Sequence, residues 1–225
     1  MTPLTTPIVE FTNVSVELDG EVRISNISFA IPRNTFVYMH GKTGCGKSLI
    51  LKLIAGFLSP TAGEVHVAGD LVNDFNDYER RQLRRSIGIV NQEGLLLPNR
   101  TILENVMLPA IVSGSSFKNA RVLAQTALKR CHLTDHADDY PQALSFGQRQ
   151  IACLARAIMN SPKLILADEP VAHLDIETAQ QLIDLLGECS LNGISVIMAS
   201  HIDVLPENIY IKSLNLTPTG VYQCN

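Results

Sequence analysis

The sequence predicts an α/β protein with a mainly parallel sheet at its centre. Short apolar runs of strand length occupy residues 36–39, 163–168 and 193–200, as expected for strands that are covered on both faces. Segments with helical spacing of apolar residues separate these runs. A stretch of alternating apolar and polar residues, 8–31, precedes them and favours an additional antiparallel β layer.

Composition allows one large domain and excludes several classes of partner. The chain has 225 residues, of which 46% are hydrophobic, enough to bury a sizeable core. The net charge of −4 gives no overall attraction to nucleic acid or to an anionic membrane surface. The basic cluster Arg80–Arg85 is a local exception, and we expect it to form a solvated helix face.

The sequence has no feature that predicts export or a membrane span. Its longest stretch without Asp, Glu, Lys or Arg is 189–202, which is shorter than the roughly 20 residues needed to cross a bilayer. Residues 1–11 contain no basic segment followed by an apolar one, so we expect no signal peptide and a cytoplasmic location. The cysteines are odd in number and form no CxxC pair, which predicts reduced thiols and no structural metal.

The first elements surround a glycine-rich loop. Residues 8–31 alternate about the turn Asp19-Gly20, which is typical of antiparallel strands, and 32–34 turn the chain into the apolar run 36–39. The sequence GKTGCGKS follows at 41–48 and matches the phosphate-loop pattern GxxxxGK[ST]. Apolar residues at helical spacing come directly after it, so strand, loop and helix stand in the order that this motif requires.

Each residue of this loop has a physical task. Glycines allow backbone conformations in which successive N–H groups point at a phosphate, and the helix N-terminus adds a favourable dipole. Lys47 is expected to reach the β- and γ-phosphates and the Ser48 hydroxyl to ligate Mg²⁺. Cys45 is either an oxidation-sensitive thiol or simply a small loop residue. The predicted nucleotide-binding residues are Gly41, Lys42, Thr43, Gly44, Cys45, Gly46, Lys47 and Ser48.

The remainder of the chain alternates between strands and helices. Residues 59–63 break the structure before a further strand, a polar helix spans about 78–85, and a strand ends at Gln92. Residues 93–159 read as a mostly helical insert, with helices over 117–133 and after residue 146. In the second of these, Ile151, Leu154, Ala155 and Ile158 fall on one face. A helix over 176–187 and short strands in 208–216 and 220–224 complete the chain.

A pair of acids ends one of the buried strands. The apolar run 163–168 delivers Asp168 and Glu169 to its carboxyl end, which is where open α/β sheets bind ligands. Asp168 is placed to hold Mg²⁺, directly or through water, and Glu169 to polarise the attacking water.

Ordered motifs along the chain resemble those of ATP-binding cassette (ABC) ATPases. LSFGQ at 144–148 resembles the signature LSGGQ, Gln92 the Q-loop glutamine, HLD at 173–175 the D-loop and His201 the switch histidine. The resemblance implies the ABC ATPase fold: a P-loop NTPase (RecA-like) core with an N-terminal antiparallel β layer and an inserted helical subdomain. It implies a single domain over 1–225, with the β layer and core in 1–92 and 160–225 and the helical signature subdomain in 93–159.

The resemblance also implies roles for the motif residues. Two subunits would form a head-to-tail dimer around two ATP molecules, with the signature of one subunit (Ser145, Phe146, Gly147 and Gln148) facing the phosphate loop of the other. Glu169 would be the general base, His201 the γ-phosphate sensor, and Lys47 a further catalytic residue. Gln92 would ligate Mg²⁺ or water, and Asp175 would connect the two sites.

Within this family, residues 84–114 most resemble the FtsE, LolD and MacB group, with LLLPNRT leaning toward FtsE. This resemblance implies an ATPase at the inner face of the cell membrane that drives an FtsX-like permease, docked near 93–114, in cell division and regulation of cell-wall hydrolysis. A LolD- or MacB-type role in lipoprotein release or efflux is an alternative. A low-turnover, ATP-dependent interaction module is another.

Several positions depart from the family pattern. Leu18 stands where an aromatic residue usually stacks on adenine, and Phe146 replaces the middle glycine of LSGGQ. Ile151 replaces the more usual Arg, His173 replaces the more usual Asn or Ala, and Asn91 replaces the more usual Phe. Leu18 and Phe146 keep the interaction module open as a hypothesis, although no catalytic residue is missing.

Overall fold

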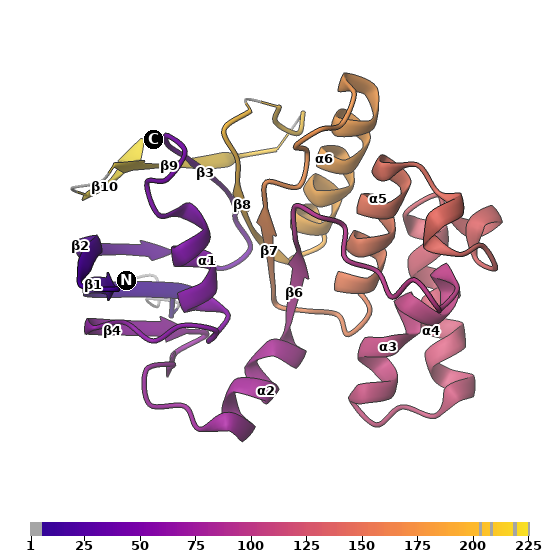
Figure 1. Ribbon diagram of the computed structural model, residues 1–225, viewed down its shortest axis with the longest axis horizontal. Helices are drawn as coiled ribbons and strands as arrows, with labels where there is room; N and C mark the ends of the chain where they lie inside the picture. The colour runs from indigo at the N-terminus through magenta and orange to yellow at the C-terminus, as the bar shows by residue number, and fades with distance from the viewer. Residues whose placement is uncertain (1–5, 203, 208, 218–219, 225) are drawn as a thin grey trace, which may run out of the picture.

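The computed structural model describes residues 6–202, 204–207, 209–217 and 220–224, with side chains up to residue 217. In this part of the chain, two sheets lie beside each other and helices pack around the larger one (Figure 1). The smaller sheet has the strand order β2-β1-β4-β5 and the larger one β10-β9-β3-β8-β7-β6. The α/β class with an antiparallel layer before a mainly parallel sheet is therefore confirmed.

The antiparallel sheet begins with the predicted hairpin. Strands β1 (Val9–Leu18) and β2 (Glu21–Ile31) pair from Val9 with Ile31 to Leu18 with Glu21. Asp19 and Gly20 make the turn with φ values of 54° and 77°. Strand β4 (Ala62–Val67) pairs with β1 and, at its other edge, with β5 (Asp70–Leu71).

The larger sheet is built from strands that run parallel, apart from a final hairpin. Strands β3 (Phe36–His40), β8 (Ser195–Ala199), β7 (Leu164–Asp168) and β6 (Ile87–Val90) are neighbours in that order, and β9 (Ile211–Thr217) lies parallel to β3 on its other side. β10 (Gly220–Cys224) is antiparallel to β9. The prediction that a strand ends at Gln92 is wrong by two residues, because pairing of β6 with β7 stops at Val90.

The helices differ from the prediction mainly in length. They are α1 (Lys47–Ile54), α2 (Asp77–Ser86), α3 (Ile102–Val112), α4 (Phe117–Arg130), α5 (Phe146–Ala157) and α6 (Ile176–Leu191), with short 3-10 turns η1 (Thr134–His136) and η2 (Pro141–Ala143). The helix predicted to reach residue 133 ends at Arg130, because His132 adopts a positive φ of 54°. Within the described residues, none of the helices combines the length and apolar character needed to cross a membrane.

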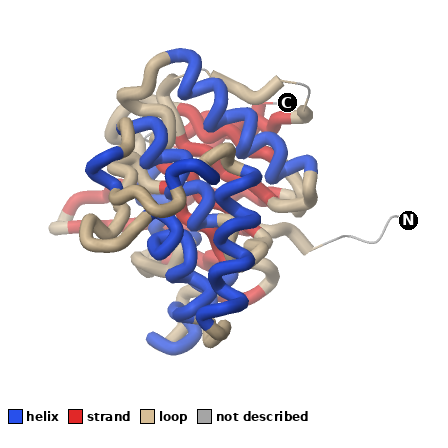
Figure 2. The backbone as a smooth tube through the Cα atoms, turned by 90° about the vertical axis from the view of Figure 1, so that its right-hand side faces the viewer, coloured by secondary structure: helices blue, strands red, loops and turns tan. Residues whose placement is uncertain are grey.

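Side chains of the parallel strands alternate between two apolar clusters. Phe36, Ile165 and Val196 belong to a cluster with α3, α4, α5 and α6, whereas Val37, Leu166 and Ile197 belong to one with α1 and the antiparallel sheet. Helices therefore cover one face, as Figure 2 shows, and α1 with the smaller sheet covers the other. The predicted division into core and helical subdomain stays a prediction, although α3 to α5 lie together on the first face.

Helix α5 is more deeply buried than predicted. The four residues that we placed on one face are buried, but Ala152 and Cys153 are buried as well. The reason is that α5 contacts β6 on one side and α3, α4 and α6 on others. Figure 1 shows it between the sheet and the remaining helices of the insert.

Candidate active site at the carboxyl edge of the parallel sheet

Three buried strands deliver the candidate residues to one edge of the sheet. Gly41 directly follows β3, Asp168 is the last residue of β7, and Ser200 directly follows β8. Because β3, β8 and β7 are adjacent and parallel, their carboxyl ends lie side by side. Strand pairing thus brings Gly41 close to Asp168 and Ser200, which lie more than 120 positions later in the sequence.

The phosphate loop needs glycine at the positions that the motif specifies. A Cβ on Gly41 would lie 2.5 Å from the carbonyl oxygen of Leu216 and 2.7 Å from Cys45 Sγ. Gly46 is the N-cap of α1 with a φ of 103°. A side chain at Gly41 would therefore collide with the backbone of β9, and the loop leads into the N-terminus of a helix, where anions bind favourably.

Lys47, the first residue of α1, is buried directly after this loop. Its side chain is 7% exposed, Nζ donates a hydrogen bond of 2.8 Å to the Gly41 carbonyl oxygen, and Glu169 Oε1 lies 3.7 Å away. A buried ammonium needs an acceptor or an anion, and a phosphate group above the loop would satisfy that need.

Ser48 and Asp168 form a pair of oxygen ligands beside the loop. Ser48 Oγ donates to Asp168 Oδ1 over 3.0 Å. Burial raises the pKa of the Asp168 carboxyl, and the hydrogen bond from Ser48 opposes that shift. No group of three or more His, Cys, Asp or Glu side chains in the described part of the chain could hold a metal ion. The pair fits Mg²⁺, which commonly uses one or two protein oxygens together with substrate phosphates.

Glu169 is held by three hydrogen bonds. Its Oε2 accepts from Ser200 Oγ over 3.1 Å and from the backbone N–H of His201 over 3.3 Å, and lies 2.8 Å from His201 Nδ1. Glu169 also adopts a φ of 46°, a left-handed conformation that is unfavourable for a residue with a Cβ and often occurs at functional sites. The contribution of Ser200, which is fully buried, was missed by the sequence reasoning.

Gln92 lies in the exposed loop after β6. Its carbonyl oxygen accepts a hydrogen bond from Gln150 Nε2, and no hydrogen bond of its own side chain is recorded in the described chain. Gln150 is fully buried, and its Oε1 lacks a partner among the described residues. Gln92 is thus tied to α5 through its backbone, and its side chain is not hydrogen-bonded to Ser48 or Asp168.

The signature and D-loop residues cap two adjacent helices. Ser145 begins α5 through a reciprocal capping box with Gln148, whose side chain also lies 3.0 Å from His136 Nε2. Asp175 begins α6, accepting from Thr178 N over 2.9 Å and from Thr178 Oγ1 over 2.8 Å. These bonds, the backbone one first, lower the pKa of Asp175.

Gly147 connects these two helix ends. A Cβ at this position would lie 2.3 Å from Thr178 Cγ2, so glycine allows α5 to approach the first turn of α6. Phe146, the unusual signature residue, is half-buried with its ring 5.6 Å from the Arg149 guanidinium. Leu18 is likewise half-buried at the end of β1 and packs on the apolar cluster of α1 and the smaller sheet.

Comparison with known proteins decides the family. The family model described as ABC transporter matches residues 24–172. The chain belongs to the ABC transporter family. As such a cassette it is an ATPase that binds ATP with Mg²⁺ as the accompanying ion.

Among the relatives of this cassette is the cell division ATP-binding protein FtsE of Haemophilus influenzae, 37% identical over 86% of the chain and 90% of the relative. The lipoprotein-releasing system ATP-binding protein LolD of Xylella fastidiosa is 38% identical over 78% and 74%. A dimeric, post-hydrolysis structure of the ATP-binding cassette MJ0796 with ADP and Pi has a TM-score of 0.86, with 32% identity over 96% of this chain and 98% of that one.

Proposed function

We propose that this cassette hydrolyses ATP to drive an FtsX-like membrane permease in cell division. The similarity to FtsE over 86% of the chain carries the choice of role. The arrangement of Lys47, Ser48, Asp168 and Glu169 supports turnover rather than binding alone, because it supplies a phosphate ligand, metal ligands and a base at one sheet edge.

Binding of the substrate falls to the phosphate loop. Its backbone N–H groups surround the β-phosphate, and Lys47 exchanges its bond to the Gly41 carbonyl for the β- and γ-phosphates. Ser48 and Asp168, which are hydrogen-bonded to each other, would hold Mg²⁺, and the ion would neutralise charge that develops on the phosphate oxygens.

Hydrolysis requires a base beside the γ-phosphate. Glu169 orients the attacking water and accepts its proton, while Ser200 and His201 fix the carboxylate. His201 also contacts the γ-phosphate as the sensor. Gln92, in the loop after β6, would be the ligand of the metal or of the attacking water.

The complete site requires a second copy of the chain. The solved relatives that are dimeric cassettes support dimerisation, and the resemblance of the signature and phosphate-loop motifs implies a head-to-tail arrangement. Ser145 and Gly147 of one subunit then donate to the γ-phosphate held by the other, at the N-terminus of α5. Asp175, at the start of α6 beside them, connects the two sites.

A groove of about 500 Å³ between α2, β6 and α3 supports a permease partner. Its apolar part includes Phe57 and Val112, each 59% exposed, and Leu108 and Pro109 from the segment predicted to dock the partner. Large exposed apolar side chains that line one groove are typical of an interaction site. The occupant that we propose is a short cytoplasmic helix or loop of the permease.

The basic cluster Arg80–Arg85 indicates the sign of charge that the docked segment should carry. The expected solvated helix face is present, with Arg81 exposed and Arg84 and Arg85 half-buried. Arg80 differs from them because it donates to the Phe75 and Gly56 carbonyl oxygens. No recorded ion pair of the described residues involves an arginine of the groove, and none of its lining residues is acidic. The docked segment therefore carries carboxylates. The lining arginines are Arg81, Arg84, Arg85 and Arg156.

Affinity capture tests the role and the docking surface together. The Glu169→Gln variant, with ATP and Mg²⁺, would be used to capture partners from solubilised membranes of the source organism, and again after Arg81→Glu and Arg84→Glu substitution. We expect an FtsX-like protein that is lost in the double arginine variant, but is retained in an Arg121→Glu control on the exposed side of α4. Retention in the double variant would exclude the groove.

The identity of the partner separates the candidate functions. A LolC/E-like or MacB-like partner would move the function to lipoprotein release or efflux, an alternative that the LolD relative supports. If the wild-type protein recruits a partner but turns over no ATP, the interaction module is the better description, and Leu18 and Phe146 are the residues to restore to the family pattern.

A further inference from the structure

A second candidate binding site lies at the opposite edge of the parallel sheet from the phosphate loop. This cavity of about 390 Å³ is lined by Asn34, which precedes β3, Lys163, which precedes β7, and Ser195, which begins β8. These are the amino ends of strands whose carboxyl ends carry the ATP site. The cavity is therefore a different site, and its volume is within the range usual for small-molecule pockets.

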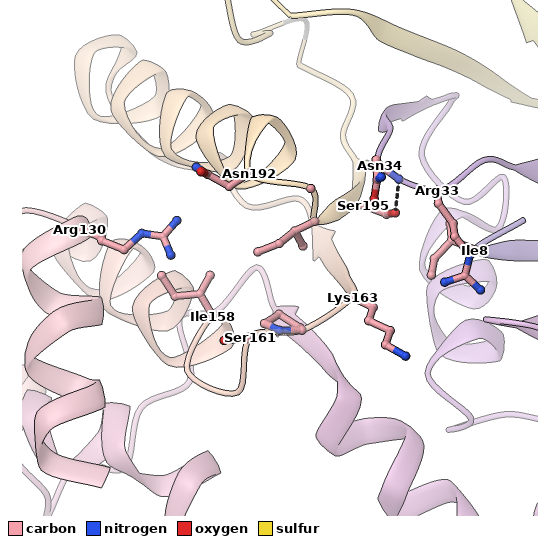
Figure 3. A pocket seen from close by; sticks show the side chains of 12 residues that line it. Ile8, Arg33, Asn34, Arg130, Ile158, Ser161, Lys163, Asn192 and Ser195 are labelled. Carbon is pink, nitrogen blue, oxygen red and sulfur yellow. Dashed lines mark hydrogen bonds between the residues drawn. The ribbon is translucent and has the colours of Figure 1, made fainter. Parts of the chain in front are cut away.

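Three basic side chains from separate segments line this cavity. Arg33 comes from the turn between β2 and β3, Arg130 from the last residue of α4, and Lys163 from the loop before β7. Figure 3 shows Arg130 on one side of the cavity and Arg33 with Lys163 on the other. Cations on opposite walls can contact the same ligand from two directions.

The positive charge of the cavity is not neutralised by the side chains that line it. None of its lining residues is acidic, and none of the ion pairs recorded for the described residues includes Arg33, Arg130 or Lys163. Arg33 donates only to neutral groups, the carbonyl oxygens of Thr6 and Ala68, at 2.9 and 3.1 Å. A concave surface lined by charges of one sign concentrates ions of the opposite sign.

Acidic groups do occur nearby, but outside this cavity. Glu188 lies close enough to influence the pKa of the Cys131 thiol, as Arg130 does, yet it is not a lining residue. Lys163 also lines a neighbouring cavity with Asp70 and Glu79 and forms no ion pair with either. These carboxylates reduce the positive potential without occupying the site.

The remaining lining residues indicate the chemistry of the uncharged part of a ligand. Ile8, Ile158 and Ile194 provide apolar walls, and Ser161 provides a polar group, as Figure 3 shows for the labelled residues. Asn192 also lines the cavity, but its Nδ2 already donates to the Glu188 carbonyl oxygen over 2.7 Å. The Ser195 hydroxyl is already used as an acceptor by the Asn34 N–H over 2.9 Å. A ligand that fits this surface has an anionic group for the cations and a short carbon skeleton that contacts the isoleucines.

We propose that this cavity binds a small organic phosphate monoester between Arg130 and Lys163. A dianion matches several cations better than a monoanion does, and the planar guanidinium of arginine is suited to phosphate oxygens. The bound ester joins the end of α4 to the strand edge of the core. The site does not depend on the proposed function, because it shares no residue with the ATP site.

Methyl NMR with glycerol 3-phosphate as the probe tests this site. The Lys47→Ala variant, labelled at isoleucine methyls, would be used so that the phosphate loop does not compete for the probe. We expect shifts of the Ile8, Ile158 and Ile194 methyls. Arg130→Gln should weaken the affinity about tenfold or more, as expected for loss of a charge-assisted bond, whereas Arg121→Gln on the same helix should not.

Three outcomes would overturn the proposal. Unchanged isoleucine methyls at millimolar probe would show that no ester enters the cavity. Equal affinity of the parent and both Arg130→Gln and Lys163→Gln variants would remove the cations as ligands. If inorganic phosphate bound as tightly as the ester, the carbon skeleton would contribute nothing, and the site would be one for free phosphate.

Discussion

His201 Nδ1 lies 2.8 Å from Glu169 Oε2, and this contact joins the proposed γ-phosphate sensor to the proposed base. The other carboxylate oxygen, Oε1, faces Lys47 Nζ at 3.7 Å. The two oxygens of one side chain are thus divided between the switch residue and the phosphate-binding lysine. A phosphate that binds to Lys47 would therefore change the electrostatic potential at the Glu169 carboxylate, which is the proposed proton acceptor.

Replacement of this base should separate binding from turnover. Glu169→Gln keeps the shape of the side chain but removes its negative charge and basicity, so we expect ATP binding with turnover lowered by roughly 100-fold or more, which is typical of a lost general base. Steady-state phosphate release and equilibrium ATP binding on the same preparation provide the two readouts. Turnover equal to that of the parent would remove Glu169 from the proposed role.

Ser200 is expected to position the base rather than to touch the substrate. Ser200→Ala deletes a hydroxyl that donates to Glu169 Oε2 over 3.1 Å, so the carboxylate loses one of the bonds that orient it. We expect kcat to fall about tenfold, the loss of roughly one hydrogen bond to a charged group, with KM little changed. Ser190→Ala, in α6, is a matched control that should leave both constants unchanged. An altered KM with normal kcat would contradict a positioning role.

The sequence allowed the main parts of the site to be predicted because short-range patterns encode them. An apolar strand that ends in Asp168 and Glu169, and a glycine loop between strand and helix, are local signals. Ser200 gave no such signal, since its role depends on the pairing of β7 with β8 and on the positive φ of Glu169. A serine is a common residue, and a contact that it makes with a segment distant in the sequence produces no local pattern from which the contact could be predicted.

Helix ends were mispredicted for related reasons. Cys131 and Leu133 are buried, so the apolar periodicity continues past Arg130, where α4 stops. The helix predicted over 176–187 continues through Gly187 to Leu191. A Cβ on Gly187 would lie 2.9 Å from Pro206 Cβ, so this glycine serves close packing rather than termination.

Gly147→Ala should disturb the contact between the signature helix and α6. The added Cβ would lie 2.3 Å from Thr178 Cγ2, and overpacking of this kind costs about 1–3 kcal/mol. We expect a lower free energy of unfolding in urea and loss of the ATP-dependent dimer measured by light scattering in the Glu169→Gln background.

The double variant Gly147→Ala, Thr178→Ser supplies the control. Serine lacks Cγ2 but keeps a hydroxyl that can donate to Asp175 Oδ2, as Thr178 does. Most of the lost stability should therefore return. If the double variant is as unstable as the single one, the clash with Thr178 is not the cause.

Asn105 is expected to hold the loop before α3. This fully buried side chain accepts from Leu97 N over 2.7 Å and donates to the carbonyl oxygens of Leu97, Arg100 and Thr101. Asn105→Ala removes these hydrogen bonds and empties a fully buried side-chain position, so we expect the free energy of unfolding to fall by about 2–3 kcal/mol. Urea denaturation measures the change, and Asn119→Ala, at an exposed position of α4, should have little effect. Equal effects of the two substitutions would contradict this interpretation.

Cys131 and Cys189 should resist alkylation in the folded protein. Burial is the main cause that raises the pKa of Cys131 to about 12 and that of Cys189 to about 11, whereas an unfolded thiol titrates near 8.5. Alkylation requires the thiolate, so at pH 8 both should react with iodoacetamide far more slowly than in urea, as peptide mass spectrometry can measure. Because the pKa of each thiol is higher in the folded than in the unfolded protein, the protonated thiol contributes to the free energy of unfolding. This contribution is complete below about pH 8.5 and declines as the pH rises toward 11 and 12. Rapid alkylation of either thiol at pH 8, under conditions where circular dichroism shows a folded chain, would contradict its burial in the apolar cluster.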